Sequence, residues 1–361
     1  MVTNTGTAAA RRRPVPVTVL TGFLGAGKTT LLNQLLRRPE LADTAVLINE
    51  FGEVGLDHLL VERLDEDTVL LNAGCLCCTV RGDLLQALSG LALRIAGGQP
   101  VRRVVIETTG LADPAPILHT LMTDPHLLRD FILDGVVTLV DAANGAATLD
   151  AQIEAVKQAA VADRLILTKA DIAGPGAASA LEARLRRLNP NAPVVRALAG
   201  EIAPVAVIGP SPYDPAARGE AVLAWLGEEA RAAGRGHHRH DHHHHHGHDP
   251  NRHDARISSF CLFLDQPIRL SGLALWLEMM VSTRGADLLR VKGLLNIEGE
   301  SLPVVLHVVG HVLHPTVRLS AWPDEDRRSR LVFILRDMPR EAVESSLRAF
   351  LSAASVPLPV R

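Results

Sequence analysis

Short apolar runs alternate with amphipathic segments along the first half of the chain. Runs rich in Val, Ile and Leu occur at 16–20, 44–49, 68–71, 103–107, 135–141 and 164–168. Nearly continuous runs of this kind are typical of strands buried on both faces of a parallel sheet. Helical stretches lie between them, at 29–38, 83–95, 148–161 and 178–188. The alternation predicts a doubly wound α/β domain that binds its ligand at the carboxyl ends of the strands.

The end of the chain follows a different pattern. Ser271 is the expected N-cap of a helix there. The predicted order of elements is strand, helix, strands and helix, which indicates a smaller α+β domain. The strands are expected at 257–265, 288–299, 302–313 and 330–337, and the helices at 271–283 and 340–354.

A histidine-rich segment separates the two patterns. A helix predicted at 219–234 closes the first domain, and the segment after it offers no residue suited to an apolar core. We therefore expect four parts: a tail at 1–14, an α/β domain at 15–234, a linker at 235–255 and an α+β domain at 256–361.

The bulk composition narrows the functional classes. The chain has 361 residues, of which 47% are hydrophobic, and its formal net charge is −3. This composition is typical of a folded protein. The net charge gives no overall positive potential that would attract nucleic acid. No apolar run has the roughly 18 residues of a membrane span, and the basic N-terminal segment lacks the apolar stretch of a secretory signal. We expect a cytoplasmic protein that binds neither nucleic acid nor membranes.

The segment GFLGAGKT at 22–29 matches the phosphate-loop pattern G-x-x-x-x-G-K-[ST] at every fixed position. It follows a predicted strand and opens a predicted helix, which is the context that the motif requires. Backbone N–H groups of such a loop and the helix N-terminus behind it bind phosphate. Lys28 is expected at the β- and γ-phosphates, and the Thr29 hydroxyl is expected at Mg²⁺. The remaining candidate contacts of the loop are Gly22, Gly25, Ala26, Gly27 and Thr30.

The tetrapeptide TKAD at 168–171 carries the candidate base contacts. It approximates the pattern N-K-x-D, in which Asp171 accepts hydrogen bonds from N1–H and N2–H of guanine. Adenine offers no such pair of donors, so GTP is favoured over ATP. Lys169 would pack its stem over the base. Thr168 stands where the pattern has Asn, which alters one polar contact.

The segment ETTG follows the predicted strand at 103–107. Glu107 is expected to orient Mg²⁺ or water, and the Gly110 amide is expected to sense the γ-phosphate. Asp141 ends another predicted strand, where a structural cap and a ligand contact are equally consistent with the sequence.

Three of the four cysteines, Cys75, Cys77 and Cys78, lie within the segment GCLCC. Thiolates bind soft or borderline metals such as Zn²⁺, Cu⁺ and Co²⁺. An incomplete ligand set suits a transfer site better than a closed structural site. A C-x-x-C redox pair and buried cysteines without a role are the alternatives. The preceding segment NEFGEVGLD adds Glu50 and Glu53, which are hard oxygen ligands for Mg²⁺ or a transition metal.

The motifs GFLGAGKTT, NEFGEVGLD, GCLCC, ETTGLADPAPI and TKAD occur in one order. Together they closely resemble the CobW-like family of P-loop GTPases, relatives of the nickel-delivery GTPases UreG and HypB. The resemblance covers residues 16–210, and the segment 288–337 resembles the family's C-terminal domain. It implies a cytosolic GTPase that binds a transition metal at its C-x-C-C loop and delivers it to a client apo-metalloprotein. Zn²⁺ or Co²⁺ is the first expectation, followed by Ni²⁺ or Fe²⁺.

The resemblance also implies residue roles. Lys28 and Thr29 would serve phosphate and Mg²⁺, and Glu107 would serve Mg²⁺ or the catalytic water. Lys169 and Asp171 would bind guanine, and the three clustered cysteines would bind the transition metal with Glu53. The chain departs from the pattern at Thr168, and at Ile48, where some relatives carry an acidic residue.

The linker adds nine candidate metal ligands: His237, His238, His240, His242, His243, His244, His245, His246 and His248. Flexible neutral imidazoles bind Zn²⁺, Ni²⁺, Co²⁺ and Cu²⁺ and would raise the local metal concentration. A linker without function is the simple alternative. His307, His311 and His314 fall on an apolar strand pattern and are expected to be structural, as is Cys261.

Our leading hypothesis is a GTP-gated metal carrier. A histidine-rich metal buffer with a regulatory GTPase domain is the alternative, and a small-molecule kinase is disfavoured because no acceptor motif is found. The client protein and a homodimer are left open.

Overall fold

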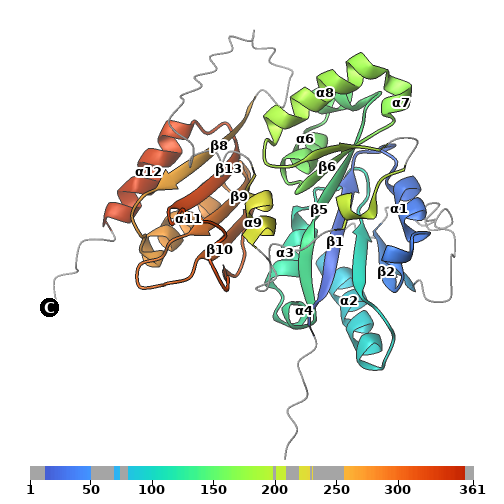
Figure 1. Ribbon diagram of the computed structural model, residues 1–361, viewed down its shortest axis with the longest axis horizontal. Coiled ribbons are helices and arrows are strands. Elements are labelled where there is room, and N and C mark those ends of the chain that lie inside the picture. Colours follow the sequence, from blue (N-terminus) through green and yellow to red (C-terminus); the bar gives the residue numbers. More distant parts are fainter. Residues whose placement is uncertain are drawn as a thin grey trace, which may run out of the picture.

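The computed structural model describes residues 13–49, 69–73, 80–197, 201–208, 219–227 and 256–353, together with Ala230. These residues form an α/β domain and a smaller α+β domain that lie side by side (Figure 1). The histidine-rich linker and the segments that carry Glu50, Glu53 and the clustered cysteines lie outside the described residues.

The first domain runs from β1 to α9, with two short 3-10 helices at Pro39–Leu41 and Pro204–Ala206. Its strands are β1 (Val15–Gly22), β2 (Thr44–Asn49), β3 (Val69–Ala73), β4 (Arg103–Glu107), β5 (Phe131–Asp141), β6 (Arg164–Thr168) and β7 (Val194–Arg196). Its helices are α1 (Lys28–Leu36), α2 (Val80–Ala96), α3 (Ala115–Thr123), α4 (Pro125–Asp130), α5 (Gly145–Ala151), α6 (Ile153–Ala160), α7 (Ala170–Ala173), α8 (Pro175–Leu188) and α9 (Gly219–Leu226).

The second domain runs from β8 to α12. Its helices are α11 (Leu270–Arg284) and α12 (Arg340–Ala353), and its strands are β8 (Ile257–Leu264), β9 (Leu288–Leu295), β10 (Val304–Val309), β11 (Val312–Leu313), β12 (Val317–Arg318) and β13 (Ser329–Arg336).

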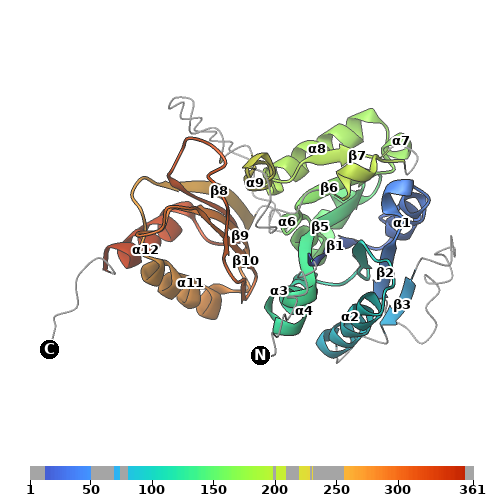
Figure 2. The same ribbon diagram turned by 60° about the horizontal axis from the view of Figure 1, so that its bottom comes forward.

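The first sheet is parallel throughout, with strand order β3-β2-β4-β1-β5-β6-β7. Alternate residues pack on opposite faces: Leu20 contacts the layer of α1, whereas Val19 joins the layer of α2 and α3. Figure 2 shows helices on both sides of this sheet. Coverage on both faces explains the continuous apolar runs and confirms the predicted P-loop fold class.

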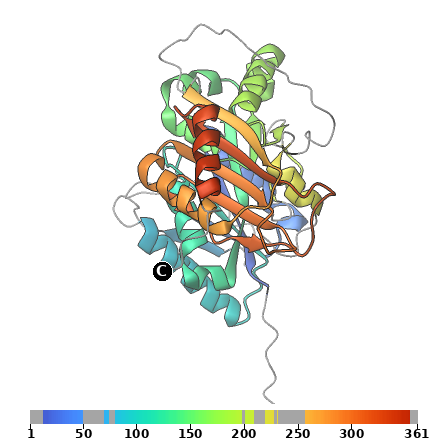
Figure 3. The same cartoon turned by 90° about the vertical axis from the view of Figure 1, so that its left-hand side faces the viewer.

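The second sheet is antiparallel, with strand order β11-β10-β9-β13-β8 and β12 paired to β10. Helices α11 and α12 cover its outer face (Figure 3). Its inner face packs on the first domain, so β9 is buried along its whole length. Val291 therefore faces the helices, while Leu294 joins an apolar core shared with the first domain.

Buried charges join the two domains. Arg290 and Lys292 of β9 both contact Oδ1 of Asp163, at 2.5 Å from the guanidinium Nη2 and 3.3 Å from the ammonium Nζ. The other carboxylate oxygen of Asp163 accepts the backbone N–H of Val136 at 2.9 Å. Lys292 also donates to the carbonyl of Trp225 at 2.8 Å. This cluster lies at the amino end of β6. The phosphate loop lies at the other end of the strands, their carboxyl ends.

Several sequence predictions are corrected by the structure. The single helix expected at 148–161 is two helices, because Gln152 adopts an extended conformation between α5 and α6. The strand expected at 302–313 is the β10–β11 hairpin, with its turn at Gly310 and an exposed His311. Ser271 is not the N-cap of α11, which begins at Leu270.

Other elements were not predicted at all. Helices α3 and α4 and the edge strand β7 have no counterpart in the expected elements. Within the described ranges, no helix combines the length and apolar character that crossing a membrane requires.

Candidate functional site

The loop between β1 and α1 needs its three glycines for two reasons, a close contact at one of them and a left-handed backbone at the other two. Gly22 has a φ of 146°, and a Cβ there would lie 2.5 Å from the Leu139 carbonyl oxygen. Gly25 and Gly27 have φ values of 74° and 89°, in the left-handed region that glycine enters without strain. Gly27 is the N-cap of α1. The loop therefore leaves the sheet and turns directly into the helix, as the motif predicts.

Lys28 opens α1 and is largely buried. Its ammonium donates to the carbonyl of Gly22 at 2.9 Å and lies 3.4 Å from that of Phe23. The N–H of Ala26 closes the turn by donating to the Phe23 carbonyl at 3.1 Å. The structure thus brings the positive charge of Lys28 back over the loop, while Thr30 is exposed on α1.

Thr29 and Glu107 meet from different elements. The Thr29 hydroxyl donates to Oε1 of Glu107 at 2.8 Å. Glu107 is the last residue of β4 and is only 3% exposed, and its backbone is in register with Leu20 of β1. Two hard oxygen donors therefore converge beside the phosphate loop. Oxygen ligands of this kind suit Mg²⁺.

The segment after Glu107 lies on the phosphate loop. A Cβ on Gly110 would lie 2.6 Å from the backbone nitrogen of Leu24, so only glycine permits this approach. The N–H of Thr108 donates to the carbonyl of Leu20 at 2.9 Å. The hydroxyl of Thr108 donates to the hydroxyl of Thr21 at 2.8 Å. The segment that begins at Glu107 therefore contacts Leu24 of the loop through Gly110, while Glu107 itself contacts Thr29 of α1.

The base-binding candidates lie at the end of β6. The hydroxyl of Thr168 donates to the carbonyl of Ala26 at 2.8 Å and contacts that of Val140 at 3.3 Å. Lys169 has a φ of 57°, and its ammonium donates to the Gly25 carbonyl at 2.7 Å. Asp171 is exposed in the first turn of α7. Two of the three residues are therefore tied directly to the phosphate loop.

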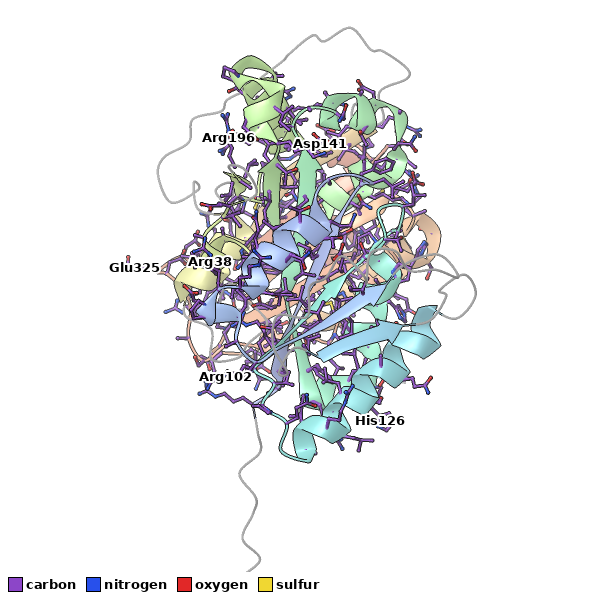
Figure 4. All side chains as sticks on the ribbon, turned by 90° about the vertical axis from the view of Figure 1, so that its right-hand side faces the viewer. Arg38, Arg102, His126, Asp141, Arg196 and Glu325 are labelled. Carbon is purple, nitrogen blue, oxygen red and sulfur yellow. The ribbon has the colours of Figure 1, made fainter. Side chains whose placement is uncertain are left out.

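The carboxylate of Asp141 holds the ammonium group of Lys169 in place. Its carboxylate accepts the ammonium of Lys169 at 2.9 Å, the N–H of Ala143 at 2.8 Å and the side-chain amide of Asn144 at 3.1 Å. Burial opposes the ionisation of Asp141, but these hydrogen bonds outweigh it and lower its pKa. Figure 4 shows Asp141 at the opposite end of the sheet from His126. Asp141 is therefore both a turn cap and a partner of the candidate base contact.

The candidate transition-metal residues lie outside the described residues: Cys75, Cys77, Cys78, Glu50, Glu53 and the histidines of the linker. The strands that lead to these segments are described. Asn49, the last residue of β2, is in register with Ala73, the last residue of β3. Ile48 is in register with Glu107. The Glu50–Glu53 segment therefore follows the strand that pairs with Glu107, and the cysteine segment follows the next strand outward. The described residues contain no group of three or more His, Cys, Asp or Glu side chains that could hold a metal ion.

Comparison with known proteins decides the family. Residues 16–196 match the family model "CobW/HypB/UreG, nucleotide-binding domain", and residues 257–351 match "Cobalamin synthesis protein cobW C-terminal domain". The chain belongs to the CobW family. It is accordingly a P-loop GTPase with the family's C-terminal domain.

Two relatives match this CobW-family chain over nearly its full length. The zinc chaperone YjiA of Escherichia coli is 34% identical over 334 residues, which span 92% of this chain and 98% of the relative. The zinc chaperone CobW of Sinorhizobium is 28% identical over 96% of this chain and 99% of its own. The crystal structure of Zn(II)-bound YjiA superposes with a TM-score of 0.66 at 30% identity, covering 94% of this chain and 99% of that structure.

Some residues around the site of this CobW-family chain were missed by the sequence analysis. Gln158 contacts the segment after Glu107, and Lys157 pairs with Asp113 of that segment at 3.0 Å. Both lie within a helix predicted only from its periodicity. That periodicity separates apolar from polar positions, so it carries no signal for a contact between distant segments.

Proposed function

We propose that the chain is a GTP-hydrolysing metallochaperone that binds a transition metal, with Zn²⁺ ahead of Co²⁺, in a nucleotide-dependent way. The observation that carries the proposal is the register of β2, β3 and β4. Strand β2 lies between β3 and β4, so the Glu50–Glu53 segment follows the strand that pairs with Glu107 and the cysteine segment follows the strand next to it. The relatives named zinc chaperones support Zn²⁺ as the cargo.

Nucleotide binding in this proposal uses the residues around the phosphate loop. Lys28 and the loop N–H groups hold the phosphates, and Asp171 and Lys169 hold guanine. Thr29 and Glu107 hold Mg²⁺, whose donor set fits because both side chains present oxygen within 2.8 Å of each other. When bound, Mg²⁺ neutralises phosphate charge. Gly110, which lies against Leu24 of the loop, is assigned the sensing of the γ-phosphate through its backbone N–H.

In the same proposal, metal binding depends on the bound nucleotide. With GTP bound, the Glu50–Glu53 segment is ordered against Cys75, Cys77 and Cys78, and the metal site closes. Hydrolysis removes the γ-phosphate contact, the segment relaxes, and the ion passes to a client apo-metalloprotein. Because coupling between two ligands is reciprocal, the metal must change the affinity for GTP by the same factor.

The test compares zinc affinity with a non-hydrolysable GTP analogue, with GDP and without nucleotide. We expect the highest affinity with the analogue and a loss of at least tenfold in Cys77→Ser. Cys261→Ala is the matched control, because Cys261 is buried in β8 of the second domain and should not affect the tight site. Equal zinc affinities in the three nucleotide states would overturn the proposal.

A deletion separates the metal carrier from the histidine-rich buffer. Removing residues 236–253 should lower the number of zinc ions bound while leaving the tight, nucleotide-dependent site. Loss of the tight site in this deletion, with Cys77→Ser unchanged, would favour the buffer.

A further inference from the structure

Gln158 on α6 is a buried polar side chain aimed at the segment after Glu107. Its side-chain nitrogen donates to the carbonyl of Gly110 at 3.2 Å and to that of Ala112 at 3.0 Å. The residue is 1% exposed. Its Oε1 is buried and has no hydrogen-bond partner among the described residues. A buried polar atom without a hydrogen-bond partner is destabilising, so a glutamine is an unfavourable residue at this position of a helix that packs in a core.

The contacted segment is held from two sides. Thr108 bonds to β1, as described above, which fixes the part of the segment that follows Glu107. Beyond Gly110, the segment is bonded to α6 by Gln158 and by the ion pair between Lys157 and Asp113. The position of Gly110 over the phosphate loop therefore depends on α6 as well as on the sheet.

The helix itself is anchored by other bonds. The backbone carbonyl of Gln158 accepts the hydroxyl of Thr138 at 2.7 Å. The side-chain amide of Asn189 donates to the carbonyls of Ala159 and Ala160 at 2.9 and 3.1 Å. None of these bonds uses the Gln158 side chain. A change of that side chain should therefore leave α6 in place and release only the 110–112 segment.

We propose that Gln158 is a positioning residue for GTP hydrolysis: it holds the carbonyls of Gly110 and Ala112 so that the segment beginning at Glu107 faces the γ-phosphate. It acts through that segment and touches no reacting atom itself. The inference rests on the role proposed above for Glu107 and Gly110, and it is independent of the metal-carrier part of that proposal.

The test is single-turnover GTP hydrolysis by the full chain in Gln158→Met, without zinc. Methionine keeps the length of the side chain and removes both donors. We expect the hydrolysis rate to fall about tenfold to a hundredfold, while the affinities for GDP and for a non-hydrolysable GTP analogue stay within about twofold. Gln152→Met, in the turn before the same helix, is the matched control and should hydrolyse GTP like the parent chain.

A second variant helps to distinguish loss of this contact from a general folding defect. Lys157→Met breaks the other bond between α6 and the segment, and it should lower the rate in the same direction by a smaller factor. An unchanged rate in Gln158→Met would overturn the proposal. So would a fall in rate matched by an equal loss of GDP affinity, because that result indicates general damage to the site. Zinc affinity measured on these variants reports separately on the metal-carrier proposal, which depends on Cys77.

Discussion

Strands β5 and β6 carry charged groups at both ends, and the two ends are built differently. At the carboxyl ends, Asp141 pairs with Lys169, whose side chain is 37% exposed. At the amino ends, Asp163 pairs with Arg290 and Lys292, which are 1% and 2% exposed. The first pair remains accessible to a ligand, whereas the second is sealed by another domain of the same chain. Exposure thus separates a charge pair suited to binding from one suited to holding domains together.

The sealed cluster holds two positive groups and one negative group. Burial is the largest influence on Lys292 and, together with the neighbouring charge of Arg290, lowers its pKa to about 7 despite the attraction of Asp163. Burial also opposes the ionisation of Asp163, but the charges of Arg290 and Lys292 outweigh it and hold the pKa of Asp163 well below its usual range. The carboxylate is therefore the group on which the cluster depends.

The largest expected effect tests this difference directly. Asp163→Asn removes the negative charge and leaves the buried guanidinium of Arg290 without compensation, which should lower the free energy of unfolding by about 3–5 kcal/mol. Asp141→Asn at the open end should cost about 1 kcal/mol, the size of a lost cap. Urea unfolding of the two variants measures both values. Equal losses would show that burial does not distinguish the two ends.

A smaller effect is expected from two histidines of the same interface. Burial, followed by the charge of Arg290, lowers the pKa of His307 well below 6.5 and that of His314 to about 3. Lys292 repels a proton on His307, and His119 repels one on His314. Below pH 6.5 the unfolded chain takes up protons that the folded chain does not, so stability is present above pH 6.5 and is lost as the pH falls.

The expected loss is about 1–3 kcal/mol between pH 7 and pH 5.5. Urea unfolding at a series of pH values measures it. His314→Gln should flatten the dependence, while His126→Gln on the exposed surface of α4 should leave it unchanged. If the free energy of unfolding depends on pH as steeply in His314→Gln as in the parent chain, His314 does not contribute to this pH dependence.

The smallest effect concerns the open end. Thr168→Val removes the hydroxyl that bonds the carbonyls of Ala26 and Val140, each bond worth about 0.5–1.5 kcal/mol. We expect GTP affinity to fall about threefold to tenfold, measured by titration calorimetry. Thr168→Asn restores the residue of the common pattern and should bind GTP about as tightly as the parent chain. A tighter complex in the Asn variant would mean that Thr168 is a weaker substitute for it.

The sequence predicted local elements best where a strand is buried on both faces. The runs at 44–49, 103–107 and 164–168 became β2, β4 and β6 with the predicted bounds. Prediction failed where one sequence pattern continues across the boundary between two elements. The apolar run of β10 continues into β11 beyond the turn at Gly310, and α5 and α6 keep a helical period across Gln152.

The candidate nucleotide site was predicted from motifs, because phosphate and guanine binding require particular residues at fixed local spacings. The structure brings Glu107, Thr168 and Lys169 to the phosphate loop and α1, and it adds contacts that motifs do not contain. Asp141 could be placed at a strand end, but its pairing with Lys169 depends on two strands meeting. Gln158 had no local signal at all.

The sequence by itself determined the fold of the first domain, the phosphate loop and the chemistry available at each strand end. These features follow from residues close together in the chain, because the backbone conformation that each requires is set by its immediate neighbours. Only the tertiary structure decided which face of β9 meets the first domain and which charges Asp163 compensates. It also decided that α6 reaches the segment after Glu107. Such choices depend on pairs of residues far apart in the chain, whose contact energies exist only after the two domains have packed.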